Sequence, residues 1–160
     1  MKNLILIRHA KSSWDNPIDD FNRELLSKGV INSIKIANLS LDFVKNRPCI
    51  WSSSAKRASE TAKIFVENWK MDVKSIEFKK DLYTFNSSQL EINVKSCSND
   101  YDNLILFGHN SAITDFVNKF RDIFIENVPT SGFVSINFDV DCWKNINKGK
   151  IIKILFPRDL

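Results

Sequence analysis

A chain of 160 residues with a net charge of +4 is long enough to bury a substantial core, and we expect residues 1–160 to form a single domain. Its 43% apolar and 26% charged residues are typical of a soluble globular protein. The basic residues are spread along the chain without a long run, which argues against a nucleic-acid partner, and no apolar run approaches the roughly 18 residues of a membrane span. Because the sequence carries no secretory signal, we expect a cytoplasmic protein without a membrane partner.

The first predicted element is a short strand that ends in two polar side chains. Residues 4–7 are apolar, too few for a helix, and predict a buried strand that runs directly into Arg8 and His9. The pattern recurs at residues 104–107, which lead through a glycine to His109, and the chain has no other histidine. Ligands of open α/β sheets bind at the carboxyl ends of the strands. If the two strands are neighbours, both histidines lie at such a site.

The next elements bring an arginine to a similar position. A loop is predicted up to Arg23, since it contains an Asn-Pro turn signal and three acids, Asp15, Asp19 and Asp20. Ser27 is a suitable N-cap for a helix over about 28–41, with an expected inner face of Val30, Ile34, Ala37 and Leu41. A strand at 49–51 then leads into a helix over about 55–69, capped by Ser53 or Ser54. Arg57 therefore falls in the first turn of that helix.

The remaining elements continue the alternation of strands and helices. A strand is predicted at 75–78, a helix capped by Ser87 or Ser88, the strand at 104–107, and a helix over about 112–124. The chain closes with an antiparallel hairpin formed by residues 133–140 and 150–156. This order predicts a three-layer α/β/α domain with a mostly parallel sheet and a C-terminal hairpin.

Arg8, His9, Arg57 and His109 have the chemistry of a phosphate site if these strands are neighbours. Two guanidiniums pair bidentately with phosphate oxygens, and a neutral imidazole can attack phosphorus. A single such histidine or arginine is more often structural or solvated, and a cation is disfavoured at a helix N-terminus unless an anion binds there. On spacing alone, the phosphate site and the structural interpretation remain equally open.

Three stretches in a fixed order carry a family resemblance: LIRHAK at 6–11, SSAKRASETA at 53–62 and FGHN at 107–110. They resemble the histidine phosphatase superfamily, which has the phosphoglycerate mutase-like fold. The opening RHAKSSW at 8–14 and the closing FPRDL at 156–160 resemble its SixA branch of phosphohistidine phosphatases. The resemblance implies that His9 is the nucleophile, that Arg8, Arg57 and His109 form the phosphate pocket, and that the backbone of Asn110 contacts the ligand.

The sequence departs from the resembled pattern at the general acid. Many superfamily members carry a glutamate after the third strand, where this chain has Thr84 or Phe85. Asp81 is the nearest carboxylate and Asp20 is the preferred alternative in the loop, with Asp15 and Asp19 also open, although an exposed loop carboxylate is the simpler interpretation of each. An acid is needed less for phosphohistidine, whose leaving nitrogen can already be protonated. The late PTSG stretch at 129–132 also resembles a Pro-Thr-Gly loop of the branch, altered by Ser131.

Other catalytic designs are disfavoured by spacing. No cysteine is followed by an arginine after five residues, no phosphate-binding Gly-x-x-x-x-Gly-Lys loop occurs, and the three cysteines lack a zinc-type or disulfide pattern. No cofactor and no metal ion are expected. Three functions stay open: a phosphohistidine phosphatase acting on a signalling or phosphotransfer protein, a small-molecule phosphomonoesterase, and a phosphate-binding regulatory module. We expect the protein to be a monomer.

Overall fold

The apolar runs of the sequence form one six-stranded sheet. In the computed structural model, which describes residues 1–14 and 19–160, the strand order is β3-β2-β4-β1-β5-β6. The bounds are β1 Lys2–Arg8, β2 Cys49–Ser53, β3 Ile76–Lys79, β4 Asn103–Gly108, β5 Phe133–Phe138 and β6 Gly149–Leu155. Strands β1 to β4 are parallel to their neighbours among themselves, whereas β5 is antiparallel to both β1 and β6. The predicted mostly parallel sheet with a C-terminal antiparallel hairpin is confirmed.

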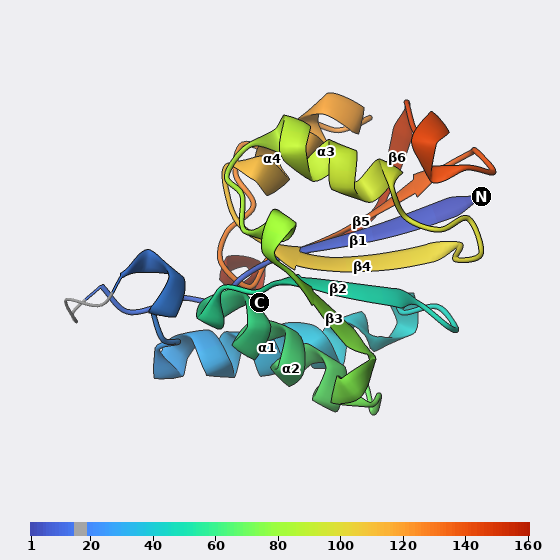
Figure 1. Ribbon diagram of the computed structural model, residues 1–160. Helices are drawn as coiled ribbons and strands as arrows, with labels where there is room; N and C mark the ends of the chain where they lie inside the picture. The colour runs from blue at the N-terminus through green and yellow to red at the C-terminus, as the bar shows by residue number, and fades with distance from the viewer. Residues whose placement is uncertain (15–18) are drawn as a thin grey trace.

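Four α-helices cover the two faces of the sheet. They are α1 Ser27–Ser40, α2 Lys56–Asn68, α3 Ser87–Lys95 and α4 Ala112–Phe120. Helices α1 and α2 lie on one face, and α3 and α4 lie on the other (Figure 1). The predicted three-layer α/β/α architecture is therefore confirmed. None of the helices in the described part of the chain is long and apolar enough to cross a membrane.

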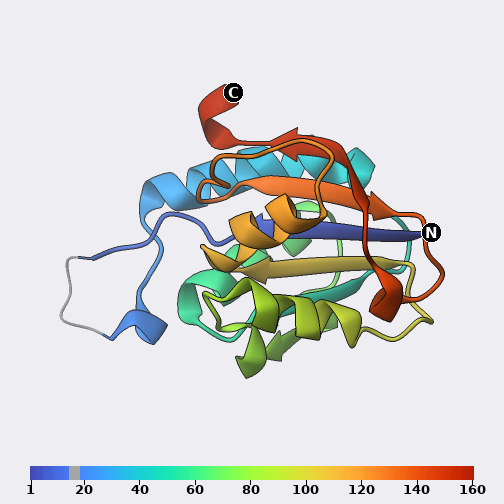
Figure 2. The same ribbon diagram turned by 90° about the horizontal axis from the view of Figure 1, so that it is seen from above.

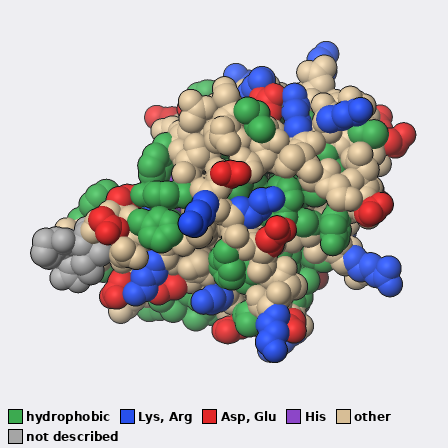
Figure 3. Space-filling model, viewed as in Figure 1, with side chains coloured by type: hydrophobic (Ala, Val, Ile, Leu, Met, Phe, Trp, Pro, Cys, Tyr) green, Lys and Arg blue, Asp and Glu red, His purple; other side chains and the backbone are tan. Residues whose placement is uncertain are grey.

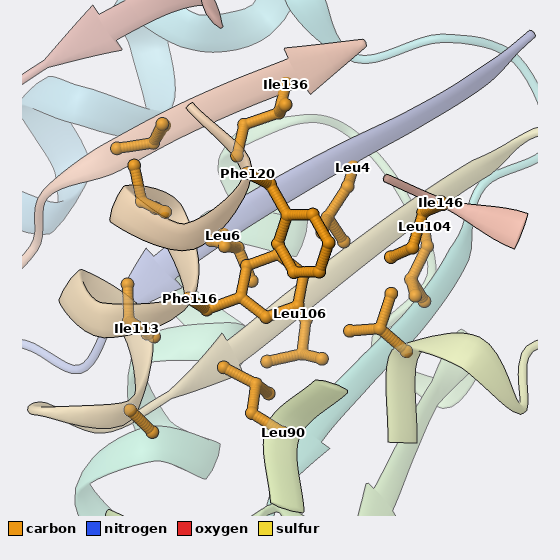
Figure 4. Packing of buried hydrophobic residues seen from close by; sticks show 14 of the residues in the cluster. Leu4, Leu6, Leu90, Leu104, Leu106, Ile113, Phe116, Phe120, Ile136 and Ile146 are labelled. Atoms are coloured by element: carbon orange, nitrogen blue, oxygen red, sulfur yellow. The ribbon is translucent and has the colours of Figure 1, made fainter. Parts of the chain in front are cut away.

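The side chains on the two faces of β1 belong to two separate hydrophobic clusters. Leu4 and Leu6 pack with residues of α3 and α4, whereas Ile5 and Ile7 pack with residues of α1 and α2. Because both faces of this strand are buried, its sequence is a continuous apolar run rather than an alternating one. Figure 4 shows the cluster on the side of α3 and α4, where residues of the strands, of these helices and of the segment before β6 meet: Leu4, Leu6, Leu90, Leu104, Leu106, Ile113, Phe116, Phe120, Ile136 and Ile146.

The sheet brings the predicted strand ends together. Strand β1 pairs directly with β4, with Arg8 opposite Gly108, and β4 pairs with β2 on its other side. The residues that follow β1, β2 and β4 therefore leave the sheet at the same edge, on the side where η1, the 3₁₀ turn Asp20–Asn22, also lies (Figures 1 and 2). This edge is where the predicted site residues were expected.

The inner face of α1 differs from the predicted one. Its buried residues are Gly29, Ser33, Ile36, Ala37 and Ser40. Of the expected residues only Ala37 is buried, and Ile34 and Leu41 are exposed. The physical reason is close approach: a Cβ atom on Gly29 would lie 2.5 Å from the carbonyl oxygen of Lys11. A reading of hydrophobic periodicity misses a face that packs through small residues.

Three helix ends also differ from the prediction. Helix α1 already begins at Ser27, with Leu26 at the N-cap position and no side-chain capping hydrogen bond, so Ser27 is not the N-cap. Helix α4 ends at Phe120 rather than near residue 124, because the side chain of Asn118 binds both the N–H and the carbonyl oxygen of Ile125 and turns the chain back. Helix α3 is capped by Asn86, whose side chain accepts hydrogen bonds from the backbone N–H groups of residues 88 and 89, and not by either serine.

Candidate functional site

The predicted arginines and the first histidine line one cavity at the carboxyl edge of the sheet. Arg8, His9, Arg57 and Asn110 are among the lining residues of this cavity, which has a volume of about 620 Å³ and which we call the main cavity. His109 is 1% exposed and lies beside His9, with 5.3 Å between the ring centroids. The residues that spacing selected are thus brought together.

His9 is held as a neutral imidazole with a defined orientation. Its Nδ1 lies 2.8 Å from the carbonyl oxygen of Ala10, which can only accept, so Nδ1 carries the hydrogen and Nε2 keeps its lone pair. Burial and, to a lesser extent, the charges of Arg57, Arg8 and Arg23 together lower the pKa of His9 to about 3, against a raising effect of the Ala10 hydrogen bond. His9 is therefore uncharged at neutral pH.

His109 is also neutral and is positioned by β2. Burial, together with smaller effects of His9 and Arg57, lowers the pKa of His109 to about 3. Its Nε2 lies 2.8 Å from the Oγ atom of Ser53, the last residue of β2. That oxygen also accepts a hydrogen bond from the N–H of Ala55, the residue before α2, so Ser53 does not cap the helix as expected. The serine positions the second histidine instead.

The two predicted arginines reach the main cavity from different elements. Arg57 is the second residue of α2 and is 1% exposed. Arg8 ends β1 and donates from Nη1 to the carbonyl oxygen of Val128 at 3.1 Å. Among the described residues, Nε of Arg8, Nε of Arg57 and Nδ1 of His109 are buried without a hydrogen-bond partner. Buried polar atoms are rarely left unpaired, and unpaired nitrogen donors beside one cavity suit an anion.

Asp20 lies in the main cavity as the counter-ion of Arg57. Its Oδ2 accepts from Nη2 of Arg57 at 2.9 Å and from the hydroxyl of Tyr83 at 2.5 Å, and its Oδ1 accepts from Arg23 at 3.0 Å. Partial burial raises the pKa of Asp20, but these three hydrogen bonds outweigh it and lower the pKa to about 2. The carboxyl is therefore ionised at neutral pH and holds no proton to donate in this arrangement.

The other proposed acids are not in this position. Asp81 is exposed in η4, the 3₁₀ turn Lys80–Leu82, and does not line the main cavity. Asp19 caps η1 by accepting from the N–H of Asn22 at 3.1 Å. Asp15 lies outside the described residues. Of the four carboxylates considered as general acid, the described part of the chain places only Asp20 against the arginines.

Arg23 is a third guanidinium that sequence reasoning missed. It lines the main cavity and donates from Nη2 to Ser12 Oγ at 2.6 Å and from Nε to the Ser13 carbonyl oxygen at 3.0 Å. Its Cζ atom stacks over the ring of Trp14, 3.2 Å from the ring centroid. The sequence around Arg23 does not distinguish it from a solvated loop arginine. Its place in the site depends on the folding of the loop, which brings Arg23 back against the segment that follows His9.

Two aromatic residues around His109 were also missed. The rings of Tyr83 and Phe85 lie edge-on to His109, with centroids at 5.3 and 5.5 Å. Phe85 stands in the stretch where the resembled pattern has its acid and lines the main cavity instead. The aromatic pair helps to bury the imidazole, which is one cause of its lowered pKa. The one indication in the sequence was that this stretch has an aromatic residue, Phe85, in place of the acid of the resembled pattern.

The late loop holds the end of β1 in place. The N–H of Ser131 donates to the carbonyl oxygens of Arg8 and His9, at 3.1 and 3.2 Å. Ser131 has a φ of 60°, the left-handed region that favours glycine, and it is the residue that alters the resembled Pro-Thr-Gly pattern. Thr130 lines the main cavity. The side chain of Asn110 is fully engaged, donating to Asn127 and Val128 and accepting from Thr114 of α4, which leaves only its backbone for the ligand contact implied above.

Comparison with solved structures places this arrangement among known folds. The chain shares its fold with solved structures of phosphatases. A structure of the protein histidine phosphatase SixA complexed with tungstate matches with a TM-score of 0.81 at 17% identity, covering 98% of both chains. A protein from Agrobacterium tumefaciens described as a SixA phosphohistidine phosphatase matches at 0.78 and 24% identity, covering 96% of this chain and 97% of that one. A mycobacterial glucosyl-3-phosphoglycerate phosphatase matches at 0.70 and 11% identity, covering 96% and 98%.

These likenesses confirm the phosphoglycerate mutase-like fold expected from the resemblance. The sequence matches no protein-family model and no curated protein. Within the described residues, no group of three or more histidines, cysteines or acids is arranged to hold a metal ion.

Proposed function

We propose that the protein is a phosphatase that forms a phosphohistidine on His9 and removes phosphate from phosphohistidine in a signalling or phosphotransfer protein. The observation that carries the proposal is the state of His9. Its hydrogen is held on Nδ1 by Ala10, its ring is neutral, and its Nε2 lone pair is free within a cavity lined by arginines. A neutral imidazole beside guanidiniums is suited to attack a bound phosphoryl group.

The proposed reaction has two steps. Nε2 of His9 attacks phosphorus, the bond from phosphorus to the substrate nitrogen breaks, and that nitrogen leaves with a proton. Water then attacks the phosphorus, the bond to His9 breaks, and inorganic phosphate is released. Arg8, Arg57 and Arg23 offset the charge on the transferring group in both steps. The unpaired buried nitrogens of Arg8 and Arg57 are available for its oxygens.

His109 is proposed to donate a hydrogen bond to the phosphoryl group. Ser53 Oγ accepts from Ala55, and we assign its own hydrogen to Nε2 of His109. The ring hydrogen of the neutral imidazole then stands on Nδ1, a buried nitrogen without a partner among the described residues. A donor held in a buried position stabilises developing charge more strongly than one in water.

The ionised state of Asp20 supports a phosphoramidate substrate. A phosphate ester needs a proton for its leaving oxygen, and the pKa of Asp20, lowered to about 2, leaves this carboxylate without one. The leaving nitrogen of a phosphohistidine can be protonated beforehand, so its cleavage does not need a carboxylic acid in the enzyme. A small-molecule phosphomonoesterase would require another acid.

Turnover of matched substrates tests the proposal. We expect rapid release of phosphate from a phosphohistidine-bearing phosphotransfer domain and from phosphoramidate, slow turnover of simple phosphate esters, and no turnover by His9→Ala. Mass spectrometry of the quenched wild-type protein should find one phosphate on His9. Rapid turnover of a small ester would instead favour the phosphomonoesterase, and phosphate binding without any turnover would favour the regulatory module.

Activity should not depend on a metal ion. The proposed steps use only protein side chains and water, so dialysis against EDTA is expected to leave the rate of phosphoramidate hydrolysis unchanged. The control is re-addition of Mg²⁺ and Zn²⁺ to the dialysed protein. Loss of activity in EDTA with recovery on adding either ion would contradict the covalent histidine mechanism.

A further inference from the structure

A second cavity, of about 270 Å³, adjoins the main one. The two share Lys11 and Thr130 in their linings, and the second is lined in addition by Lys28, Asn32, Pro129, Pro157 and Arg158. We call it the basic cavity, because Lys11, Lys28 and Arg158 line it and no acidic residue of the described part of the chain does. None of the roles assigned so far uses Lys28 or Arg158.

Three segments that are distant in the sequence supply these cations. Lys11 follows His9, Lys28 lies in the first turn of α1, and Arg158 lies in η6, the 3₁₀ turn Pro157–Asp159. The C-terminal η6 lies against α1 (Figure 2). The tertiary structure therefore gathers like charges that repel one another, beside a site that already holds three arginines.

The positive charge of the basic cavity is poorly offset. Arg158 has a single long contact to its neighbour Asp159, 4.0 Å between Nε and Oδ1, and both side chains are exposed, so this pair contributes little. Lys11 and Lys28 take part in no ion pair within the described residues, whereas Lys56 is paired with Glu24. The face seen in Figure 3 shows basic and acidic side chains interspersed. Lys28 is also in a helix turn that carries no acid and disfavours a cation.

We propose that the basic cavity receives carboxylates from the surface of the protein substrate while its phosphohistidine occupies the main cavity. This inference rests on the proposed function. It follows from the position of the basic cavity: the two cavities share Lys11 and Thr130, so a protein attached to a phosphoryl group on His9 has the basic cavity directly beside its point of attachment.

The state of the side chains favours a protein surface over a small dianion. Arg23 and Arg57 are fixed by several hydrogen bonds, as the recognition of a small group requires, but Lys11, Lys28 and Arg158 are exposed on long stems. Such cations attract a charged surface and fix its orientation without defining one rigid ligand. The main cavity is also rimmed by exposed Trp14 and Phe85, which offer apolar contacts beyond the size of a metabolite.

Charge reversal separates docking from chemistry. We would compare the wild type, Lys28→Glu/Arg158→Glu, and the matched control Lys144→Glu/Lys148→Glu. Lys144 and Lys148 are exposed and precede β6 at the opposite end of the sheet. The substrates are an acidic phosphohistidine-bearing phosphotransfer domain and phosphoramidate. We expect Lys28→Glu/Arg158→Glu to lower kcat/KM for the protein substrate about tenfold or more, through KM, and to flatten its salt dependence. Phosphoramidate turnover should change by less than about twofold in both variants.

Each outcome decides the matter. A second double variant, Lys28→Gln/Arg158→Gln, removes the two charges without reversing them. The proposal is overturned if kcat/KM for the protein substrate is unchanged in both double variants, or if Lys144→Glu/Lys148→Glu lowers it equally. Phosphoglycolate is a small molecule with one phosphate and one carboxylate. If the Lys28 and Arg158 variants lower kcat/KM for phosphoglycolate as much as for the protein substrate, the basic cavity is a metabolite subsite instead. If the wild type hydrolyses neither substrate, the proposed function fails. Calorimetric binding of the unphosphorylated domain, weakened only in the Lys28 and Arg158 variants, would then still support docking, and equal binding would overturn it.

Discussion

His9 and His109 are neutral although each could gain a proton near pH 6.5 in water. Burial and the nearby arginines oppose that proton, lowering the pKa of each imidazole to about 3. In the proposed reaction, anion binding and nucleophilic attack therefore fall to different side chains. The positive charge that faces an anion comes from the arginines and Lys11 rather than from the imidazoles, and His9 keeps the lone pair that a protonated ring would lack.

Asp20 acts as an internal counter-ion that a bound phosphate must displace or share. Its carboxylate pairs with Arg57, which is almost fully buried, and with Arg23. We expect Asp20→Asn to bind orthophosphate several-fold more tightly, measured by calorimetry. In the absence of phosphate, its free energy of unfolding should fall by roughly 1–2 kcal/mol, because Arg57 loses its charged partner.

Asp19→Asn is the matched control, since Asp19 caps η1 without contacting an arginine. It should leave the affinity for orthophosphate unchanged. If Asp20→Asn bound orthophosphate no better than the wild type did, the carboxylate would not compete with the anion. A large loss of phosphate-ester turnover in Asp20→Asn would restore this residue as the general acid.

At the level of elements, the strands were predicted well and the α1 face was not. A strand buried on both sides needs apolar residues at every position, and that signal is unambiguous at residues 4–7 and 104–107. Helix α1 packs through glycine, serine and alanine, residues that a hydrophobic pattern does not weigh. The face was therefore decided by how closely the helix approaches the segment after His9.

Gly29 provides the test of this close approach. Gly29→Ala should lower the free energy of unfolding by about 1–3 kcal/mol, although alanine favours helix, because its Cβ would meet the Lys11 carbonyl oxygen at 2.5 Å. Denaturant unfolding measures the change. Asn38→Ala, at an exposed position of the same helix, is the control and should not destabilise the protein. A Gly29→Ala protein as stable as the wild type would show that α1 can move away without cost.

For the whole molecule, the buried neutral histidines predict sensitivity to acid. In the unfolded chain they take up protons below about pH 6.5, whereas in the folded protein they do so only near pH 3. The unfolded state therefore binds more protons between these values, and stability falls as the pH falls. Each histidine contributes up to about 1.4 kcal/mol per pH unit in this window. Asp20, with its lowered pKa, adds a loss only below about pH 3.8.

Urea unfolding at pH 7.5, 5.5 and 4.5 measures this effect. The His9→Gln/His109→Gln variant should show a shallower loss of stability over that range. Nitrogen NMR of the two imidazoles provides an independent check, since both rings should retain neutral chemical shifts down to pH 5. Protonation of either ring near pH 6.5 in the folded protein would contradict the pKa values on which the proposed nucleophile depends.

The layers, the parallel sheet and the placement of Arg8, His9, Arg57 and His109 at strand ends and a helix start were all predictable from the sequence. Those features depend on local periodicity and on the rule that parallel strands end at one edge, both of which are present in one dimension. The tertiary structure alone decided that Asp20 rather than Asp81 faces the arginines. It also decided that Arg23, Tyr83 and Phe85 join the site and that three cations line an adjoining cavity. These positions depend on how the loops fold back across the edge of the sheet. Contacts between segments that are distant in the sequence produce no periodic pattern of residue types, so they could not be predicted from it.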